Sequence, residues 1–185
     1  MEVAAREGLP LPAHRAVLSS TPFFREALER LGEEKGEEGV RVELRECSLS
    51  AVERALDFIY TGTFDAGEGV DGCLELLHCG ATLQVEGLVR ACARRAEALL
   101  HPSSVARVWE AAAALELERL KSKCLRFIID HYDACRPEKE ASVKEAMRRH
   151  PAFFDLVLSA LSPGPGAASK LGKARSAPPP PPAPR

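Results

Sequence analysis

Apolar and polar residues alternate near the start of the chain with the period of extended strands. Residues 1–14 form two short extended pieces around Glu7 and Gly8, and the prolines at positions 10 and 12 suit a sheet edge better than a helix interior. In residues 40–44, Val, Val and Leu alternate with Arg and Glu, which is the period of a half-buried strand. The pattern predicts a hairpin and then a third strand.

A helical period follows each of these extended pieces. We expect a short helix over residues 14–20 and a second one opened by Thr21 and Pro22, which ends in the acidic, glycine-punctuated loop of residues 32–39. Ser50 and Glu53 form a capping box for a further helix, which ends at Thr61-Gly62. The first 62 residues therefore mix strands and helices.

From residue 70 the pattern is helical up to residue 161, and part of it repeats at an offset of 32. Six of sixteen positions are identical between residues 79–94 and residues 111–126. Each copy reads as a helix, a break near Gln84-Val85 or Glu116-Leu117, and a second helix. The repeat predicts two helical hairpins that stack and bury their matching apolar positions.

The last segments differ from this stack in composition. Ser142 and Glu145 predict a capped helix, and residues 150–161 predict a final amphipathic one. Residues 162–185 are rich in Gly, Pro, Ala and Ser, which predicts a disordered tail with polyproline character. Aromatic residues at core-like helical positions are expected to be buried: Phe23, Phe24, Trp109, Phe127, Phe153 and Phe154.

Composition and charge exclude several classes of protein. Apolar residues make up 45% of the 185 positions, but no apolar run approaches the roughly 20 residues that cross a bilayer. Beyond position 160 every charged residue is basic, so the preceding part carries 21 basic against 27 acidic residues. An acidic body argues against nucleic-acid binding, because phosphate contacts need a basic face. We expect neither a membrane nor a nucleic-acid partner.

The candidate reactive residues do not form a reaction centre. The six cysteines fall singly in apolar segments without a CxxC pair, which predicts reduced core thiols in an intracellular protein that is cytoplasmic, nuclear or both. His14 has no metal-ligand or triad partner at a suitable spacing, so we interpret it as structural. No phosphate-binding glycine loop is present. The sequence predicts no enzyme, no cofactor and no metal site.

The segments "LPAHRAVLSSTPFFREAL" and "VRVELRECSLSAVERALDFIYTGTF" resemble the BTB/POZ domain family. The family comparison implies an α+β fold, with a small sheet flanked by helices over residues 1–100, and places His14 under that sheet. Residues 101–161 resemble the 3-box and the start of the BACK region, and their end is similar to speckle-type POZ proteins. Residues 162–185 remain as the proline-rich basic tail.

The resemblance implies a protein-interaction adaptor whose partner is cullin-3. Two departures from the family pattern are visible: no MATH or Kelch substrate domain is present, and the chain begins at the first family strand, without the N-terminal dimerisation helix. A truncated form would explain both, and a BTB homo- or hetero-dimer would be weakened. The alternatives are a scaffold or transcription-regulatory protein without a cullin, and a regulator that competes with full-length adaptors.

The family also implies which residues would contact the cullin. A hydrophobic-x-Glu element in the loop after the paired-phenylalanine helix corresponds here to Leu31 and Glu33, and Tyr60 lies nearby in the family. Val105 and Val108 of the 3-box would extend the contact. The alternative for Leu31 is a helix C-terminal residue that folds back onto Leu28.

The tail carries a second candidate binding motif. Arg175, Pro178 and Pro181 match a ligand of polyproline-binding domains. The alternative is a low-complexity terminus without a partner, because proline runs are common in disordered tails.

Overall fold

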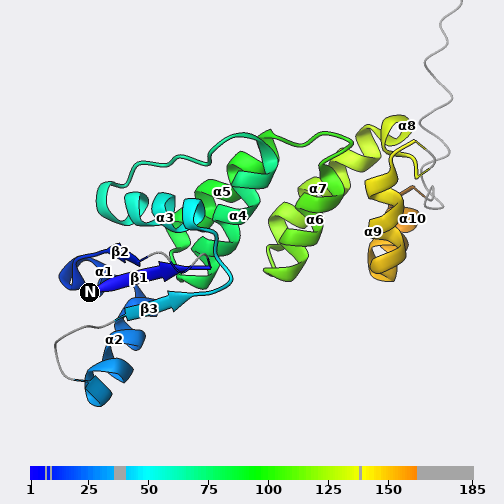
Figure 1. Ribbon diagram of the computed structural model, residues 1–185. Helices are drawn as coiled ribbons and strands as arrows, with labels where there is room; N and C mark the ends of the chain where they lie inside the picture. The colour runs from blue at the N-terminus through cyan, green and yellow to red at the C-terminus, as the bar shows by residue number, and fades with distance from the viewer. Residues whose placement is uncertain (7, 9, 36–40, 138, 162–185) are drawn as a thin grey trace, which may run out of the picture.

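The structure, a computed structural model, describes residues 1–6, 8, 10–35, 41–137 and 139–161, with only the backbone of residues 32–35, 160 and 161. Three strands in this part of the chain form one sheet with the order β2-β1-β3 (Figure 1). The strands are β1 (Glu2–Ala5), β2 (Pro10–Pro12) and β3 (Arg41–Leu44). Val3 pairs with Leu11 in antiparallel β2 and with Val42 in parallel β3. The predicted hairpin and third strand are confirmed.

The alternating pattern of β3 explains how the sheet joins the core. Val42 and Leu44 are buried, whereas Arg41 and Glu43 are exposed. Successive side chains of a strand point to opposite faces, so this alternation puts one face of the strand against the helices. Val3 in the central strand is fully buried. The small sheet therefore covers one end of the helical body.

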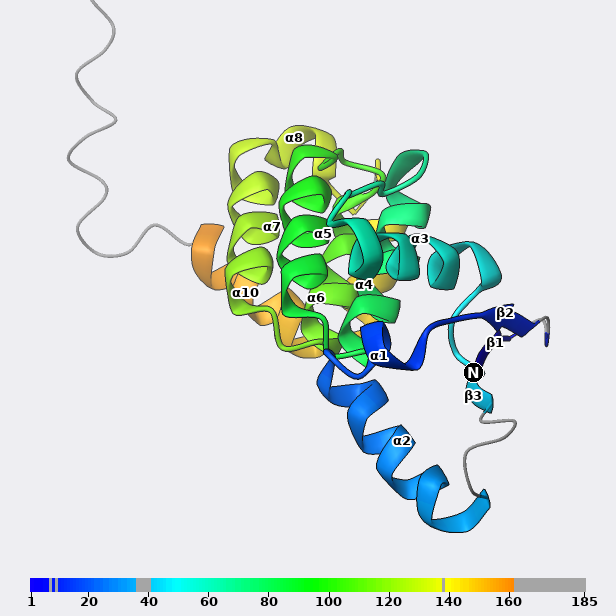
Figure 2. The same cartoon turned by 90° about the vertical axis from the view of Figure 1, so that its left-hand side faces the viewer.

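The helix of the paired phenylalanines is longer than predicted. After the short α1 (Arg15–Leu18), α2 (Pro22–Lys35) buries Phe24 and Leu28 and continues past Gly32. A single glycine costs a helix only about 1 kcal/mol, and the residues that follow it are good helix formers. The loop predicted to begin at residue 32 is therefore wrong for residues 32–35, and its remainder lies outside the described residues. Figure 2 shows α2 leading away from the helical body.

The next helix, α3 (Leu49–Thr61), begins two residues earlier than the capping box predicted. Its N-cap is Ser48, whose Oγ accepts a hydrogen bond from the N–H of Ala51 at 3.4 Å. The same hydroxyl donates to Glu75 at 2.8 Å. The end at Gly62 is confirmed, because this glycine adopts φ +73° and its N–H donates to the carbonyl of Phe58 at 2.8 Å.

The rest of the described chain is a stack of helices. They are α4 (Gly69–Thr82), α5 (Glu86–Ala98), α6 (Val105–Ala114), α7 (Glu118–Asp130), α8 (Tyr132–Cys135), α9 (Ala141–Arg149) and α10 (Pro151–Leu161). The hairpin α4–α5 packs beside the hairpin α6–α7, and α9 and α10 close the far end (Figure 1). The stacked hairpins predicted from the repeat are confirmed.

Both hairpins turn through a residue of the same unusual conformation. Gln84 has φ +55° and Glu116 has φ +54°, and the two positions are 32 residues apart. In each turn the following N–H bonds back into the first helix: Val85 to Gly80 at 2.9 Å and Leu117 to Ala112 at 2.8 Å. The two helix breaks predicted from the sequence are confirmed.

At the C-terminal end the observed cap and one aromatic residue differ from the prediction. The N-cap of α9 is Glu140, whose carboxylate accepts from the N–H of Ser142, so Ser142 lies inside the helix. Phe153 is fully buried, with its ring 4.3 Å from that of Trp109. Phe154 is 43% exposed, because it lies outside the narrow stripe of α10 that packs.

The burial of the cysteines agrees with the sequence-based prediction, whereas the position of His14 does not. All six cysteines are free and buried, which confirms the prediction of core thiols. His14 does not pack under the sheet: its side chain is exposed at the start of α1, and its N–H donates to the hydroxyl of Tyr60 at 2.7 Å. That hydrogen bond ties α1 to the end of α3.

Candidate functional site

A groove crosses the two stacked hairpins between α5 and the start of α7. It holds about 620 Å³ and is lined on one side by α5 and on the other by the α6–α7 turn. The partly buried Val89, Ala93 and Leu117 form its floor together with the buried Leu120. A second hollow of about 410 Å³ shares Val89 and Arg90 with the groove and extends it to Pro22 at the start of α2.

The floor follows from the positions of these residues on their helices. Val89 and Ala93 are four residues apart, so they lie on one face of α5. Leu117 is the N-cap of α7, and the left-handed conformation of Glu116 turns the chain immediately before it. Because α5 packs beside α7, the two faces meet and leave a strip of apolar surface partly uncovered.

The rim of the groove is charged, and several of its charges are already paired. Glu86 pairs with Arg90 at 3.1 Å, and Glu118 pairs with Lys121 at 2.7 Å. Among the residues that the structure describes, the rim arginines Arg94 and Arg119 have no ion pair, and neither has Glu116. The groove therefore offers an apolar floor and two free guanidinium groups on its rim, opposed by one free carboxylate.

Of the predicted contact residues, Leu31 and Glu33 lie within α2 rather than in a loop. Leu31 is partly buried against the core, three residues after the buried Leu28 on the same face of the helix. This position favours the packing alternative for Leu31. The side chain of Glu33 lies outside the described residues.

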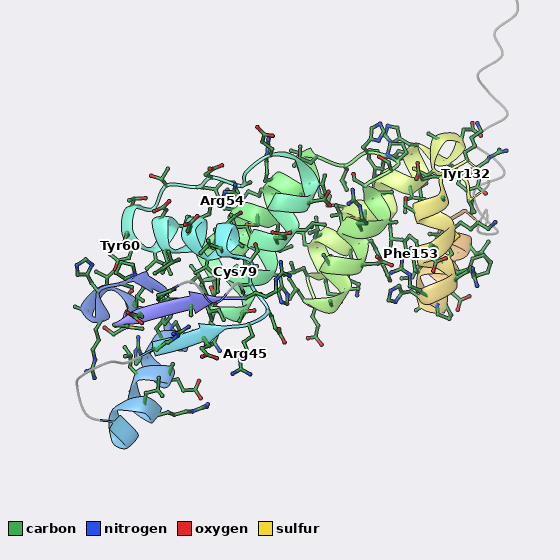
Figure 3. The ribbon with its side chains drawn as sticks, viewed as in Figure 1. Arg45, Arg54, Tyr60, Cys79, Tyr132 and Phe153 are labelled. Carbon is green, nitrogen blue, oxygen red and sulfur yellow. The ribbon has the colours of Figure 1, made fainter. Side chains whose placement is uncertain are left out.

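Tyr60 is at the surface, with 41% of its side chain exposed at the end of α3. Its hydroxyl also lies 3.1 Å from Nδ1 of His14, and the two rings meet edge to face. Figure 3 shows Tyr60 at the α1 end of the molecule, opposite the end that carries Phe153.

The two 3-box residues do not reach the surface. Val105 and Val108 on α6 are fully buried. Both side chains pack inside the hairpin stack, and the predicted contact of these two residues with a cullin stays a prediction. The structure does not gather the predicted contact residues of α2, α3 and α6 into one patch. Arg175, Pro178 and Pro181 lie outside the described residues.

Sequence reasoning missed the groove because it treated every apolar position of the repeat as internal. One signal could have indicated it: the apolar Val89 has the charged Lys121 as its counterpart 32 positions later, so the second hairpin does not repeat this apolar position. Apolar residues that depart from a structural repeat are candidates for a surface that only one copy provides.

The described part of the chain contains neither a candidate metal-binding cluster nor a candidate membrane-spanning helix. No group of three or more His, Cys, Asp or Glu side chains there could hold a metal ion. No helix there is both long enough and apolar enough to span a bilayer.

Comparison with known proteins agrees with the fold. The BTB/POZ domain family model matches residues 2–99. Over 128 residues the chain is 27% identical to a BTB/POZ domain-containing protein and to the ARM repeat protein interacting with ABF2, both of Arabidopsis thaliana. These alignments cover 69% of this chain but 45% and 18% of the relatives, so the chain spans less than half of either.

The similarity to speckle-type POZ proteins, the BACK-like boundary and the domain limits at residues 100 and 161 stay predictions. The family model covers more than half of the sequence, and it covers the sheet together with α1 to α5. The chain belongs to the BTB/POZ domain family.

Proposed function

We propose that this protein is an adaptor that binds cullin-3 and thereby connects a ubiquitin ligase to a target. The adaptor part rests on the family, because the BTB/POZ domain is a protein-interaction module that also mediates dimerisation. The cullin part rests on the resemblance of the spaced motifs in residues 11–64. The single observation that carries the site is the groove between α5 and α7.

The groove has the composition of a protein-interaction surface. Such surfaces join an apolar centre to a polar rim. Val89, Ala93 and Leu117 supply the centre, and the rim arginines Arg94 and Arg119 supply donors for carboxylates or carbonyls of a partner. The extension of the groove to Pro22 brings in α2, the helix that carries the hydrophobic-x-Glu element.

Leu31, Glu33 and Tyr60 enter the proposal as a second contact region. Leu31 has some exposed surface, and Tyr60 is exposed enough to be covered by a partner. In the same proposal the motif of Arg175, Pro178 and Pro181 binds a polyproline-recognising domain, independently of the cullin.

Capture of cullin-3 by the full chain tests the adaptor proposal. We expect purified cullin-3 to be retained by the immobilised protein, and less of it by the Leu31→Asp variant. Because Leu31 is partly buried, the melting temperature of the variant must be measured beside its binding. Failure of the folded parent chain to retain cullin-3 would overturn the proposal. Ubiquitination of a co-captured protein then separates an adaptor from a competitor of full-length adaptors.

The scaffold without a cullin remains the second candidate, and one comparison favours it. The ARM repeat protein is named for an interaction with ABF2. A chain that recovers partners from a reconstituted mixture but not cullin-3 would indicate the scaffold. Deletion of residues 163–185 tests the tail, since unchanged partner recovery would leave the motif of Arg175, Pro178 and Pro181 without a role.

A further inference from the structure

The helix α10 carries most of the large apolar side chains that the described chain exposes. Of the four such residues, three lie on α10: Phe154, Leu156 and Leu158, which are 43%, 42% and 47% exposed. Only Asp155 and Ser159 are polar among the 11 residues of this helix. A helix that is apolar on nearly every side is normally covered on nearly every side. The composition of α10 therefore indicates that its outer surface has an occupant.

Two of these side chains share one face of the helix. Phe154 and Leu158 are four residues apart, so they lie next to each other, whereas the buried Phe153 and Val157 lie on the adjoining inner face. Asp155 is exposed and three residues before Leu158, and in the described part of the chain it forms no ion pair. The Phe154–Leu158 face thus combines apolar surface with an uncompensated negative charge.

The size of this surface favours an occupant on the same chain. A stable dimer needs about 800 Å² from each partner, whereas the exposed parts of Phe154, Leu156 and Leu158 amount to about 200 Å². A segment of the same chain loses little translational freedom when it binds, because it is already present at an effective concentration of about millimolar. A second copy of the protein lacks that advantage.

The proline-rich basic tail has the chemistry that this face needs. Every charged residue in residues 162–185 is basic, so the tail is opposite in charge to Asp155. The five consecutive prolines at 178–182 favour a polyproline helix, which loses little conformational entropy on binding. Aromatic side chains are the usual recognition surface for such a helix, and Phe154 supplies an exposed ring.

The connection to α10 is long enough to let the prolines return. Residues 162–177 can span up to about 50 Å when extended, at about 3.3 Å per residue. Phe154 lies seven residues before the end of α10 at Leu161, which is about 10 Å along the helix axis. Gly164 and Gly166 alternate with prolines, and both residue types are common where a chain reverses direction.

We propose that residues 178–185 lie across Phe154 and Leu158 of the same chain, held also by attraction between the basic tail and Asp155. The contact covers the exposed face of α10 and occupies Pro178 and Pro181. A polyproline-binding domain must then displace α10 before it engages the tail, a consequence that rests on the function proposed for the tail motif. The groove between α5 and α7 shares no residue with α10, so it stays open.

Paramagnetic labelling of the full chain tests the contact. Because all six native cysteines are buried, a thiol-reactive nitroxide should label Ala183→Cys first. We expect the methyl NMR signals of Leu158 to broaden strongly in this background, and much less once Phe154→Asp removes the ring and repels no basic residue. The tether is identical in both proteins, so the difference reports the contact alone.

A matched variant on the same helix serves as the control. Ala152 is exposed but lies away from the Phe154–Leu158 face, so Ala152→Asp should keep the broadening of Leu158. Equal broadening with and without Phe154→Asp would show that the tether alone brings the label near, and it would overturn the proposal.

Light scattering over a concentration series identifies the other possible occupant. The parent and Phe154→Asp should have the same mass at each concentration, because the contact lies within one chain. A parent that associates more strongly than Phe154→Asp would assign the face to a second copy and overturn the proposal.

A competition experiment tests the consequence for the tail. A panel of SH3 domains is first screened with a synthetic peptide of residues 172–185, and a domain that binds it is titrated with the full chain. The full chain should bind about threefold more weakly than the peptide, and Phe154→Asp should restore the affinity of the peptide. Equal binding by parent and peptide would contradict the occlusion of the tail. If the peptide binds no domain, the function proposed for the motif fails, whereas the labelling experiment still decides the contact.

Discussion

The two helical hairpins share a turn but differ in what covers them. Both reverse direction through a residue with positive φ, Gln84 in α4–α5 and Glu116 in α6–α7. The first hairpin packs against α3, whereas the second packs against α9 and α10. The repeated residues thus specify the shape of each hairpin. The residues that differ between the two copies decide which helices pack against each hairpin. Val89 and Ala93 are among the residues that differ, and they form half of the groove floor.

The largest expected effect comes from removing the aromatic contact that supports the second hairpin. Phe153→Ala deletes the ring that packs against Trp109 at 4.3 Å, which should cost about 3–5 kcal/mol of unfolding free energy. Hydrogen exchange should show the loss in α6 and α7 more than in α4 and α5. Phe154→Ala, on the exposed side of the same helix, is the control, with a change within about 0.5 kcal/mol. Equal loss of protection in both hairpins would contradict separate support.

Alkaline pH should destabilise the fold through its buried thiols, and the repeat counterparts allow a comparison. Burial raises the pKa of Cys124 to about 12. The pKa of Cys92, its counterpart in the repeat, is also raised, chiefly by the neighbouring Cys73 side chain and then by burial. Above the unfolded pKa of about 8.5, the unfolded chain releases these protons while the folded chain keeps them. The unfolding free energy therefore falls as pH rises, by up to about 1.4 kcal/mol per pH unit for each thiol until the folded pKa is reached.

Urea unfolding at pH 8 and pH 10 measures this dependence. The parent should lose about 1–2 kcal/mol more between the two values than Cys124→Ala does, because the variant lacks one such thiol. A loss of the same size in both proteins would show that Cys124 does not contribute.

A smaller effect should distinguish the helix contacts inside the two hairpins. At Gly80 in α4, an added Cβ would lie 3.1 Å from Cγ of Leu88, whereas the equivalent position of the second hairpin is already an alanine, Ala112. Overpacking costs about 1–3 kcal/mol, which exceeds the roughly 1 kcal/mol gained in helix propensity. Gly80→Ala should therefore lower the unfolding free energy by about 1 kcal/mol. A stabilised variant would mean that α4 and α5 separate easily.

The smallest effect tests the shared turn. Glycine adopts positive φ without the steric cost that other residues bear, so Gln84→Gly and Glu116→Gly should each stabilise the protein by up to about 1 kcal/mol. Ser122→Gly, at an exposed position inside α7, should instead lose about 0.5 kcal/mol. Opposite signs at the two turns, read from thermal or urea unfolding, would contradict the equivalence of the hairpins.

Features set by local sequence could be predicted, and features set by distant contacts could not. The turns at Gln84 and Glu116 and the end at Gly62 follow from short patterns. The cap of α3 does not: Ser48 and Ser50 are both suitable, and Ser48 also bonds to Glu75 on α4, a contact 27 residues away. The end of α2 was predicted too early for a local reason, because a single glycine costs a helix only about 1 kcal/mol and does not end it at Gly32.

The candidate site shows the same limit. Val105 and Val108 were predicted at a contact surface from family placement, yet their burial depends on how α6 packs between its neighbours. The groove exists only because α5 and α7 lie side by side, and the repeat fixes that adjacency without fixing which side chains stay uncovered. The residues that line such a groove can thus be predicted from the sequence only when it is known which face of each helix meets the other.

Calorimetry with the N-terminal domain of cullin-3 tests the central claim most directly, using two substitutions on one helix. Ala93→Arg fills the groove with a long charged side chain, and Ala98→Arg makes the same change at an exposed position of α5 outside it. The account predicts that the parent and Ala98→Arg bind with equal Kd, whereas the folded Ala93→Arg variant binds about 30-fold more weakly, a loss of about 2 kcal/mol. A parent that does not bind, or an Ala93→Arg variant that binds as tightly as the parent, would contradict it.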